Sequence, residues 1–163
     1  MCIRDGCGPS VVEQPRHPGE LTTIVQEIGR RIVHRTELAR ELRRLRHREV
    51  ARIGWRDLAG WATLEEVVAT LSELADGIIE IALACAHREV PDRYGHPLGD
   101  DTGPPVSLPV FGLGNPGGWE LNLSSVGDLC FSYAVTGDTL GPRKTRKQAF
   151  LLQLGRPLIE CLK

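Results

Sequence analysis

The sequence predicts an α+β fold, in which helices come first and a small sheet with a covering helix follows. Three observations lead to this prediction. Apolar residues recur at steps of three and four through residues 21–57 and again through 63–89, as they do along one face of a helix. Residues 91–105 are dense in proline, glycine and aspartate, which is typical of a loop. Beyond this loop, two short segments read as strands.

Composition excludes several classes of protein. A chain of 163 residues suits one domain, or one domain with a helical extension. Its 20 Lys and Arg residues against 21 Asp and Glu residues give a net charge of -1, so no overall field attracts nucleic acid or membrane. The five cysteines are odd in number and form no CxxC pair, which predicts reduced thiols in a cytoplasmic protein. The most apolar run, GIIEIALACA, is too short for a bilayer, and no leader sequence is expected.

The N-terminal part is predicted to be a tail followed by a helical segment over residues 21–95. Residues 1–20 are rich in proline and glycine and lack apolar periodicity, so we expect a disordered or expression-derived tail without function. The apolar spacing over residues 21–57 fits one long helix or two shorter ones. Residues 30–57 hold ten arginines and four acids, a local charge of +6. A solvated helix face is the favoured interpretation, and an anion-binding face is the alternative.

Residues 63–89 are predicted to form one long helix. Thr63 and Glu66 have the spacing of a capping box, in which each side chain bonds the other residue's backbone amide. The apolar stripe that follows is expected to lie in the core. The residues predicted to be buried are Leu64, Val67, Leu71, Leu74 and Ile78. His87 is expected to interact with the helix dipole rather than with a metal.

Two strands and a final helix are predicted in residues 96–163. A strand near 106–113 should pair with a strand through 128–133, with Pro109 favouring an edge position. After a turn, residues 146–163 begin as an amphipathic helix that Pro157 should kink or end.

The segment between the two strands has the features of a phosphate-binding loop. Gly117 and Gly118 would allow a tight turn whose backbone amides face an anion, and Ser124 and Ser125 follow before the second strand. An ordinary strand-to-helix turn is the simpler interpretation of the glycines alone. Nucleotidyl transfer also needs carboxylates two residues apart on one strand, so that both face the metal ions. Those two positions are occupied here by Val126 and Asp128.

The stretch GLGNPGGWELNLSSVGDLCFSY resembles the signature of bifunctional glutamine synthetase adenylyltransferase/adenylyl-removing enzymes, G-x-G-K-L-G-G-x-E-L-N-x-S-S-D-I-D-L-I-F. The resemblance extends over residues 38–162, and the ELN triplet is closer to the N-terminal, adenylyl-removing half of the family. It implies that residues 96–163 are part of a nucleotidyltransferase domain of the DNA polymerase β-like type. The implied activity moves AMP to or from a tyrosine of glutamine synthetase, with Mg²⁺ and ATP as cofactors and a nitrogen-signalling protein as regulator.

The resemblance also implies site residues. Asp128 would be the catalytic residue and metal ligand, and the nucleotide would be bound by Gly112, Gly114, Gly117, Gly118, Ser124 and Ser125. Four positions depart from the signature: Asn115 replaces a lysine, Pro116 a leucine, Val126 the first metal-binding aspartate and Gly127 an apolar residue. Asp138 is expected to be a turn residue rather than a substitute ligand. We therefore expect a shortened member of the family with impaired catalysis.

Two other classes of function stay open at this point. A non-catalytic module could use the same fold to bind a nucleotide or a protein. A nucleic-acid-binding protein could use the arginine-rich residues 30–57, although Trp55 is the only aromatic residue among them and the chain is nearly neutral.

Overall fold

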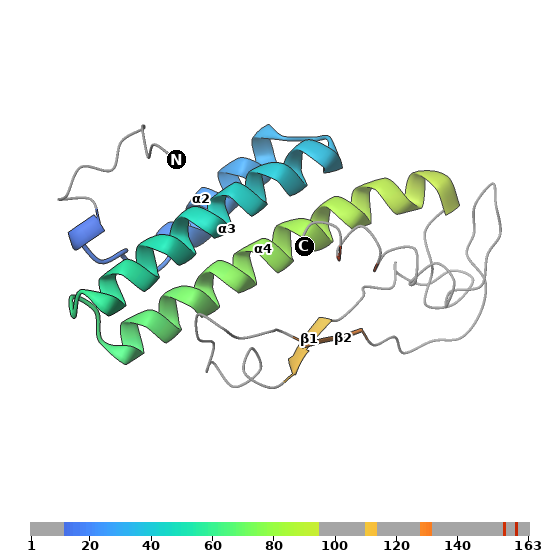
Figure 1. The fold of residues 1–163 in the computed structure, drawn as a ribbon. Coiled ribbons are helices and arrows are strands. Elements are labelled where there is room, and N and C mark those ends of the chain that lie inside the picture. Colours follow the sequence, from blue (N-terminus) through green and yellow to red (C-terminus); the bar gives the residue numbers. More distant parts are fainter. Residues whose placement is uncertain (1–11, 95–109, 114–127, 132–154, 156–158, 160–163) are drawn as a thin grey trace.

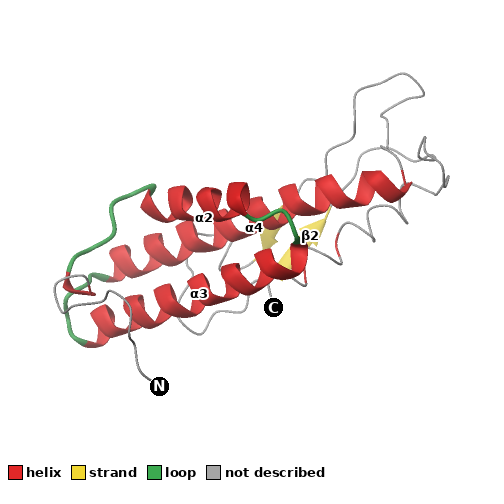
Figure 2. Ribbon diagram, turned by 90° about the horizontal axis from the view of Figure 1, so that it is seen from above, coloured by secondary structure: helices red, strands yellow, loops and turns green. Residues whose placement is uncertain are grey.

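Three helices form the main body of the protein (Figure 1). The structure, a computed structural model, describes residues 12–94, 110–113, 128–131, 155 and 159. The helices α2 (Glu20–Arg31), α3 (Arg35–Leu58) and α4 (Leu64–Tyr94) run alternately up and down, and α4 packs against both others. Seen from above, α4 extends well beyond α2 and α3 at one end of the bundle (Figure 2).

The predicted α+β fold is wrong for the part of the chain that the structure describes, because this part is a helical bundle without a sheet domain. Its only strands are β1 (Val110–Leu113) and β2 (Asp128–Phe131), four residues each, which pair antiparallel. Such a pair is too small to form a sheet with a core of its own. Residues 106–109 and 132–133 of the two predicted strands lie outside the described residues. The predicted helix at 146–163 lies outside the described residues except for Gly155 and Ile159.

The N-terminal helical segment is two helices, which decides between the two alternatives for residues 21–57. Ile32 leaves α2 with an extended backbone (φ -108°, ψ 115°), and His34 is extended before α3. Acidic Glu20 lies in the first turn of α2 and basic Arg30 and Arg31 lie in its last turn. Both placements favour the helix dipole.

A Schellman motif ends α3 and turns the chain into α4. Gly60 has φ +71°, a left-handed conformation that glycine adopts without a steric penalty. The amide of Gly60 donates to the Asp57 carbonyl at 3.0 Å, and the amide of Trp61 donates to the Arg56 carbonyl at 2.9 Å. These are the two hydrogen bonds that define the motif, and they fix the path of residues 59–61.

The start of α4 carries only half of the predicted capping box. The Thr63 hydroxyl accepts a hydrogen bond from the amide of Glu66 at 3.2 Å, as expected. The Glu66 carboxylate does not return to Thr63. It accepts instead from Nε of Arg56 at 2.9 Å, because the end of α3 brings that guanidinium within reach. The helix therefore begins where the sequence predicts, with one partner exchanged.

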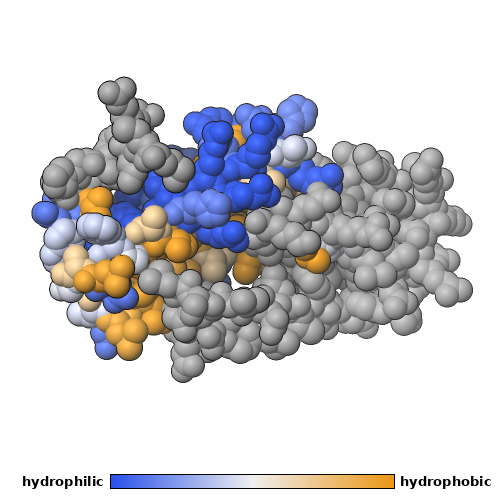
Figure 3. Space-filling view, viewed as in Figure 1, coloured by the Kyte–Doolittle hydropathy of each residue, from blue (hydrophilic) through white to orange (hydrophobic). Residues whose placement is uncertain are grey.

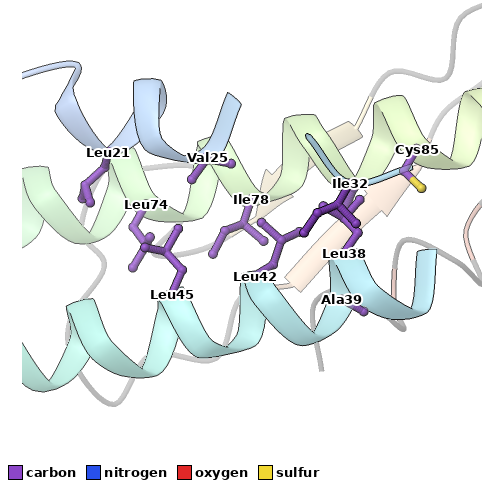
Figure 4. Packing of buried hydrophobic residues seen from close by; sticks show 11 residues of the cluster. Leu21, Val25, Ile32, Leu38, Ala39, Leu42, Leu45, Leu74, Ile78 and Cys85 are labelled. Atoms are coloured by element: carbon purple, nitrogen blue, oxygen red, sulfur yellow. The ribbon is translucent and has the colours of Figure 1, made fainter. Parts of the chain in front are cut away.

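The core lies between the three helices (Figure 4). The main cluster of buried residues comprises Leu21, Val25, Ile32, Leu38, Ala39, Leu42, Leu45, Leu74, Ile78, Ala82 and Cys85. A smaller one, near the turn between α3 and α4, comprises Ile53, Val67 and Leu71. The predicted burial is confirmed for four of five residues of α4. It is wrong for Leu64, which is 70% exposed because it is the first residue of α4 and lies at the end of the bundle.

Helices α2 and α4 are closely packed at Gly29. A Cβ atom added to Gly29 would lie 2.8 Å from Cγ2 of Ile81, closer than real carbon contacts allow. At Gly77 of α4, an added Cβ atom would meet Val25 at 3.4 Å, an ordinary contact. The missing side chain at Gly29 therefore allows the two helices to pack closely.

Candidate functional site

Two residues of the predicted nucleotide site lie in described strands, Gly112 in β1 and Asp128 in β2. The others, Gly114, Gly117, Gly118, Ser124 and Ser125, lie outside the described residues. The same holds for Asp138 and for the four positions that depart from the family signature, Asn115, Pro116, Val126 and Gly127. Of the predicted site, the structure therefore describes the two strands on either side of the glycine-rich segment and their pairing.

The register of the strand pair brings the two ends of the glycine-rich segment together. Leu113, the last residue of β1, pairs with Asp128, the first residue of β2, and Gly112 pairs with Leu129. Because the pair is antiparallel, residues 114–127 leave and return at the Asp128 end of the ladder. The predicted convergence of Gly117 and Gly118 with Asp128 is compatible with this register and stays a prediction.

The Mg²⁺ site that the resemblance implies lies mostly outside the described residues, which include Asp128 but not Val126. Among them, no group of three or more His, Cys, Asp or Glu side chains could hold a metal ion. The signature itself keeps one of its two aspartates, since the residue two positions before Asp128 is Val126. Valine has no donor atom, and Mg²⁺ requires oxygen ligands. The signature therefore supplies one of the two strand carboxylates that such a site needs.

A buried charge network lies elsewhere, between α3 and the residues that precede α2. Glu49 of α3 is fully buried. Its carboxylate accepts hydrogen bonds from Nη2 of Arg16 at 2.8 Å, Nε of Arg16 at 3.3 Å and Nε of Arg48 at 3.2 Å. A fully buried carboxylate is stable only when it is paired in this way, so Arg16 and Glu49 hold each other in place.

Two more arginines of α3 extend the network to the backbone of residues 12–14. Arg56, 2% exposed, donates to the carbonyls of Val12, at 3.2 Å, and of Glu13, while Arg52 donates to the carbonyl of Gln14. Residues 12–20, which the sequence analysis assigned to a tail, are therefore bound to the bundle. We call Arg16, Glu49, Arg52 and Arg56 the clamp.

The charges of the clamp are unequally compensated. Burial disfavours the charged form of Arg16, but the hydrogen bonds and negative charges of Glu49 and Glu20 outweigh it and raise the pKa of Arg16. Burial, followed by repulsion from Arg16, lowers the pKa of Arg52, against the attraction of Glu49. Nε of Arg52 is also buried without a hydrogen-bond partner. Both guanidiniums stay charged near neutral pH, and Arg52 is the less well compensated of the two.

The clamp was missed by both interpretations of the arginine-rich segment. Neither a solvated face nor an anion-binding face describes Arg52 and Arg56, which are buried among protein groups. A signal was present in the spacing. Glu49 follows Leu38, Leu42 and Leu45 at the next core position of α3, and a carboxylate at such a position requires a buried cation.

Comparison with known proteins identifies the family. The family described as glutamate-ammonia ligase adenylyltransferase matches residues 5–163. The chain belongs to this adenylyltransferase family. The resemblance found in the sequence is thus confirmed, and the match includes most of residues 1–20 as well as the glycine-rich signature.

Individual relatives are similar over most of the chain. A bifunctional glutamine synthetase adenylyltransferase/adenylyl-removing enzyme of Thioalkalivibrio sulfidiphilus is 40% identical over 160 residues, which are 98% of this chain and 16% of that protein. Proteins of the same name from Nitrosococcus oceani and Chromobacterium violaceum are 47% and 49% identical, over 78% and 77% of this chain and 13% and 14% of their own lengths. The chain thus spans about one-seventh of the adenylyltransferases it matches.

No helix in the described part of this adenylyltransferase family member is long and apolar enough to cross a membrane. The thiol of Cys85 is buried in the core between the helices.

Proposed function

We propose that the chain supplies part of a nucleotidyl-transfer unit that handles AMP linked to a tyrosine of glutamine synthetase. The observation that carries this proposal is the family match over residues 5–163, which includes the glycine-rich signature. The names of relatives at 40–49% identity include glutamine synthetase as the target and both the addition and the removal of adenylyl groups. The ELN triplet at residues 120–122 favours the adenylyl-removing type. Glutamine synthetase and a nitrogen-signalling regulator are the proposed partners.

In this proposal the glycine-rich segment binds the phosphates. The backbone amides of Gly114, Gly117 and Gly118 would donate to phosphate oxygens, since glycine permits a close approach of the main chain. The hydroxyls of Ser124 and Ser125 would add donors on the path back to β2. Asp128 would stand beside the phosphate through its place opposite Leu113 at the mouth of the loop. The register of β1 and β2 supports this arrangement because it joins both ends of the loop.

The same proposal includes impaired catalysis. Val126 stands where the family signature has an acid, and Asn115 stands where it has the cation of the loop. Loss of a charged group that stabilises the transition state costs several kcal/mol, and each ~1.4 kcal/mol is tenfold in rate. We therefore expect this chain to bind nucleotide weakly and to turn over at least ~1000-fold more slowly than a family member with both acids.

Calorimetric titration with ATP and a labelled-AMP transfer assay on glutamine synthetase test the proposal. We expect weak ATP binding by the unmodified chain and no detectable transfer in either direction. Val126→Asp should strengthen ATP binding in the presence of Mg²⁺, and Asn115→Lys should strengthen it further by restoring a cation. Lys147→Asn, outside the signature, is the control for a change in charge. Absence of nucleotide binding in all four proteins would overturn the proposed nucleotide site, whereas rapid turnover by the unmodified chain would overturn only the impairment.

A non-catalytic binding module is the second candidate function. The observation in its favour is a set of exposed tryptophan, leucine and arginine side chains on α3 and at the start of α4. Binding of a protein to these side chains by a chain that binds no nucleotide would favour this candidate.

A further inference from the structure

The outward face of α3 carries an unbroken stripe of exposed residues. These are Arg40, Arg44, His47, Ala51, Trp55 and Leu58. At 3.6 residues per turn they lie within an arc of roughly 100°, opposite the buried face of the helix. The stripe is about 27 Å long, at 1.5 Å per residue. It is divided along its length, with basic residues in the first half and apolar residues in the second.

The basic half keeps its charges at the surface. Arg40 donates from Nε to the carbonyl of Thr36 at 3.3 Å, and Arg44 forms an ion pair with Glu41 at 2.8 Å. The Arg44 side chain is 76% exposed despite this pair. A guanidinium has five N–H donors in a planar fork, and each of these contacts uses one of them. A carboxylate of another molecule can therefore still be bound by Arg40 and Arg44.

The apolar half gathers large hydrophobic side chains at one end of the bundle. Trp55 is 61% exposed and Leu58 is 87% exposed, and they are joined by Trp61 at 45% and Leu64 at 70%. The Schellman turn at Gly60 fixes the backbone of Trp61 at this end of the bundle. Figure 3 shows hydrophobic residues gathered at the end where α3 meets α4 and hydrophilic residues along the rest of the bundle. Such clusters mark interaction sites, and tryptophan and arginine dominate binding energies at protein interfaces.

The division of the stripe decides which partner fits it. A nucleic acid would place phosphates against Leu58 and Leu64 as well as against the arginines. A membrane surface favours helices whose apolar face runs along their whole length, which the basic half of α3 interrupts. A protein helix of about 20 residues matches the length of the stripe and can carry acids on one half and apolar residues on the other.

We propose that this stripe of α3 docks a helical protein segment with carboxylates over Arg40 and Arg44 and apolar residues over Trp55 and Leu58. The complementary charges set the direction of the bound helix, because only one orientation places acids over the basic half. The contact buries Trp55 and leaves the clamp and the strand pair unchanged. The surface is therefore independent of the nucleotide site.

Binding of synthetic helical peptides to the whole chain tests the proposal. The probes are labelled 20-residue helices with four glutamates on one half of a face and four leucines on the other, made in both chain orders, and twins with lysine for glutamate. We expect one chain order of the glutamate peptide to bind at least ten times more tightly than its lysine twin, measured by fluorescence anisotropy. Equal binding of the twins, or no binding of either glutamate peptide, would overturn the proposal.

Substitutions locate the binding surface. The double variant Arg40→Glu/Arg44→Glu should weaken binding of the glutamate peptide at least tenfold, while Arg30→Glu/Arg31→Glu, with the same change in charge on exposed residues of α2, should change it less than threefold. Leu58→Ser should weaken binding, whereas Val33→Ser, which alters another exposed apolar residue, should not. Equal effects within either pair of variants would contradict the stripe as the docking surface.

Three further measurements distinguish other occupants. A DNA duplex or anionic vesicles that displace the bound peptide and bind more tightly than it would overturn the assignment to a protein partner. Sedimentation of the chain alone reports self-association. A dimer that Leu58→Ser dissociates would assign the stripe to a second copy and overturn the proposal, and a monomer supports it.

Discussion

Arg16 and Glu49 are joined by two hydrogen bonds, at 2.8 and 3.3 Å, across 33 positions of the sequence. Arg16 precedes α2, and Glu49 lies in α3, where its carboxylate has no exposed area. Pairs of this kind contribute little when compared with a well-packed apolar pair, but they are costly to break, because the remaining charge stays buried. The first prediction follows from this asymmetry.

Glu49→Gln should lower the free energy of unfolding by about 3 kcal/mol, because Arg16 and Arg52 lose their buried counter-charge. Urea unfolding followed by circular dichroism measures the loss. The control is Glu41→Gln on the same helix, which removes a surface pair with Arg44 and should cost about 0.5 kcal/mol or less. Equal losses would mean that the clamp is no stronger than a surface ion pair.

In a double-mutant cycle, Arg16→Gln and Glu49→Gln should be coupled by about 1–3 kcal/mol.

Gly29→Ala and Gly77→Ala should have opposite effects on stability. An alanine in a helix interior is favoured over glycine by about 1 kcal/mol in either position. At Gly29 the new methyl group would meet Cγ2 of Ile81 at 2.8 Å, and such overpacking costs about 1–3 kcal/mol. We expect a net loss of about 1 kcal/mol for Gly29→Ala and a small gain for Gly77→Ala, measured as shifts in the thermal midpoint. A gain at both positions would show that α2 and α4 are not closely packed at Gly29.

The helices were predictable from the sequence because their signals are local. Thr63 and the apolar stripe of residues 67–78 fix the start and the buried face of α4, and both are read from neighbouring residues. Leu64 is exposed because of where the neighbouring helix ends, and the sequence pattern within α4 does not indicate that position. The α+β prediction failed because two strand-like segments were taken for a sheet domain, whereas the described strands pair over only four residues each.

The family and the pairing of the two strands could be predicted from the sequence. The side-chain contacts of the clamp could not. The signature around Gly117 and Asp128 identified the family without any structure. The clamp could not be derived in the same way, because Arg16 and Glu49 are distant in sequence and their pairing depends on the packing of residues 12–16 on α3. Side chains in an arginine-rich segment differ in burial, and burial is a property of the whole fold.

Leu74→Ala and Leu64→Ala should differ in their cost to stability, because only Leu74 is buried. Both leucines lie on the same apolar stripe of α4, but Leu74 is buried in the main core and Leu64 is exposed at the end of the bundle. Leu74→Ala should cost about 2–5 kcal/mol, through lost apolar burial and a cavity. Leu64→Ala should cost about 0.5 kcal/mol or less. Urea unfolding of both variants measures the difference. A large loss from Leu64→Ala would indicate that this side chain packs against another part of the chain.

Stability should fall at acid pH as the Glu20 carboxylate is protonated. Burial disfavours its charged form, but hydrogen bonds from the amide of His17, at 3.1 Å, and from Arg16 outweigh burial and lower the pKa of Glu20 below its ordinary value of 4.5. A carboxylate with a lowered pKa contributes stability that is fully present above the ordinary pKa and is lost as the pH falls through the lowered one. Glu20→Gln should therefore reduce stability at pH 7 and make little difference well below the lowered pKa. Urea unfolding of both proteins from pH 7 to pH 2.5 measures this. A stability difference that stays constant over the whole range would contradict the proposed role of the carboxylate charge.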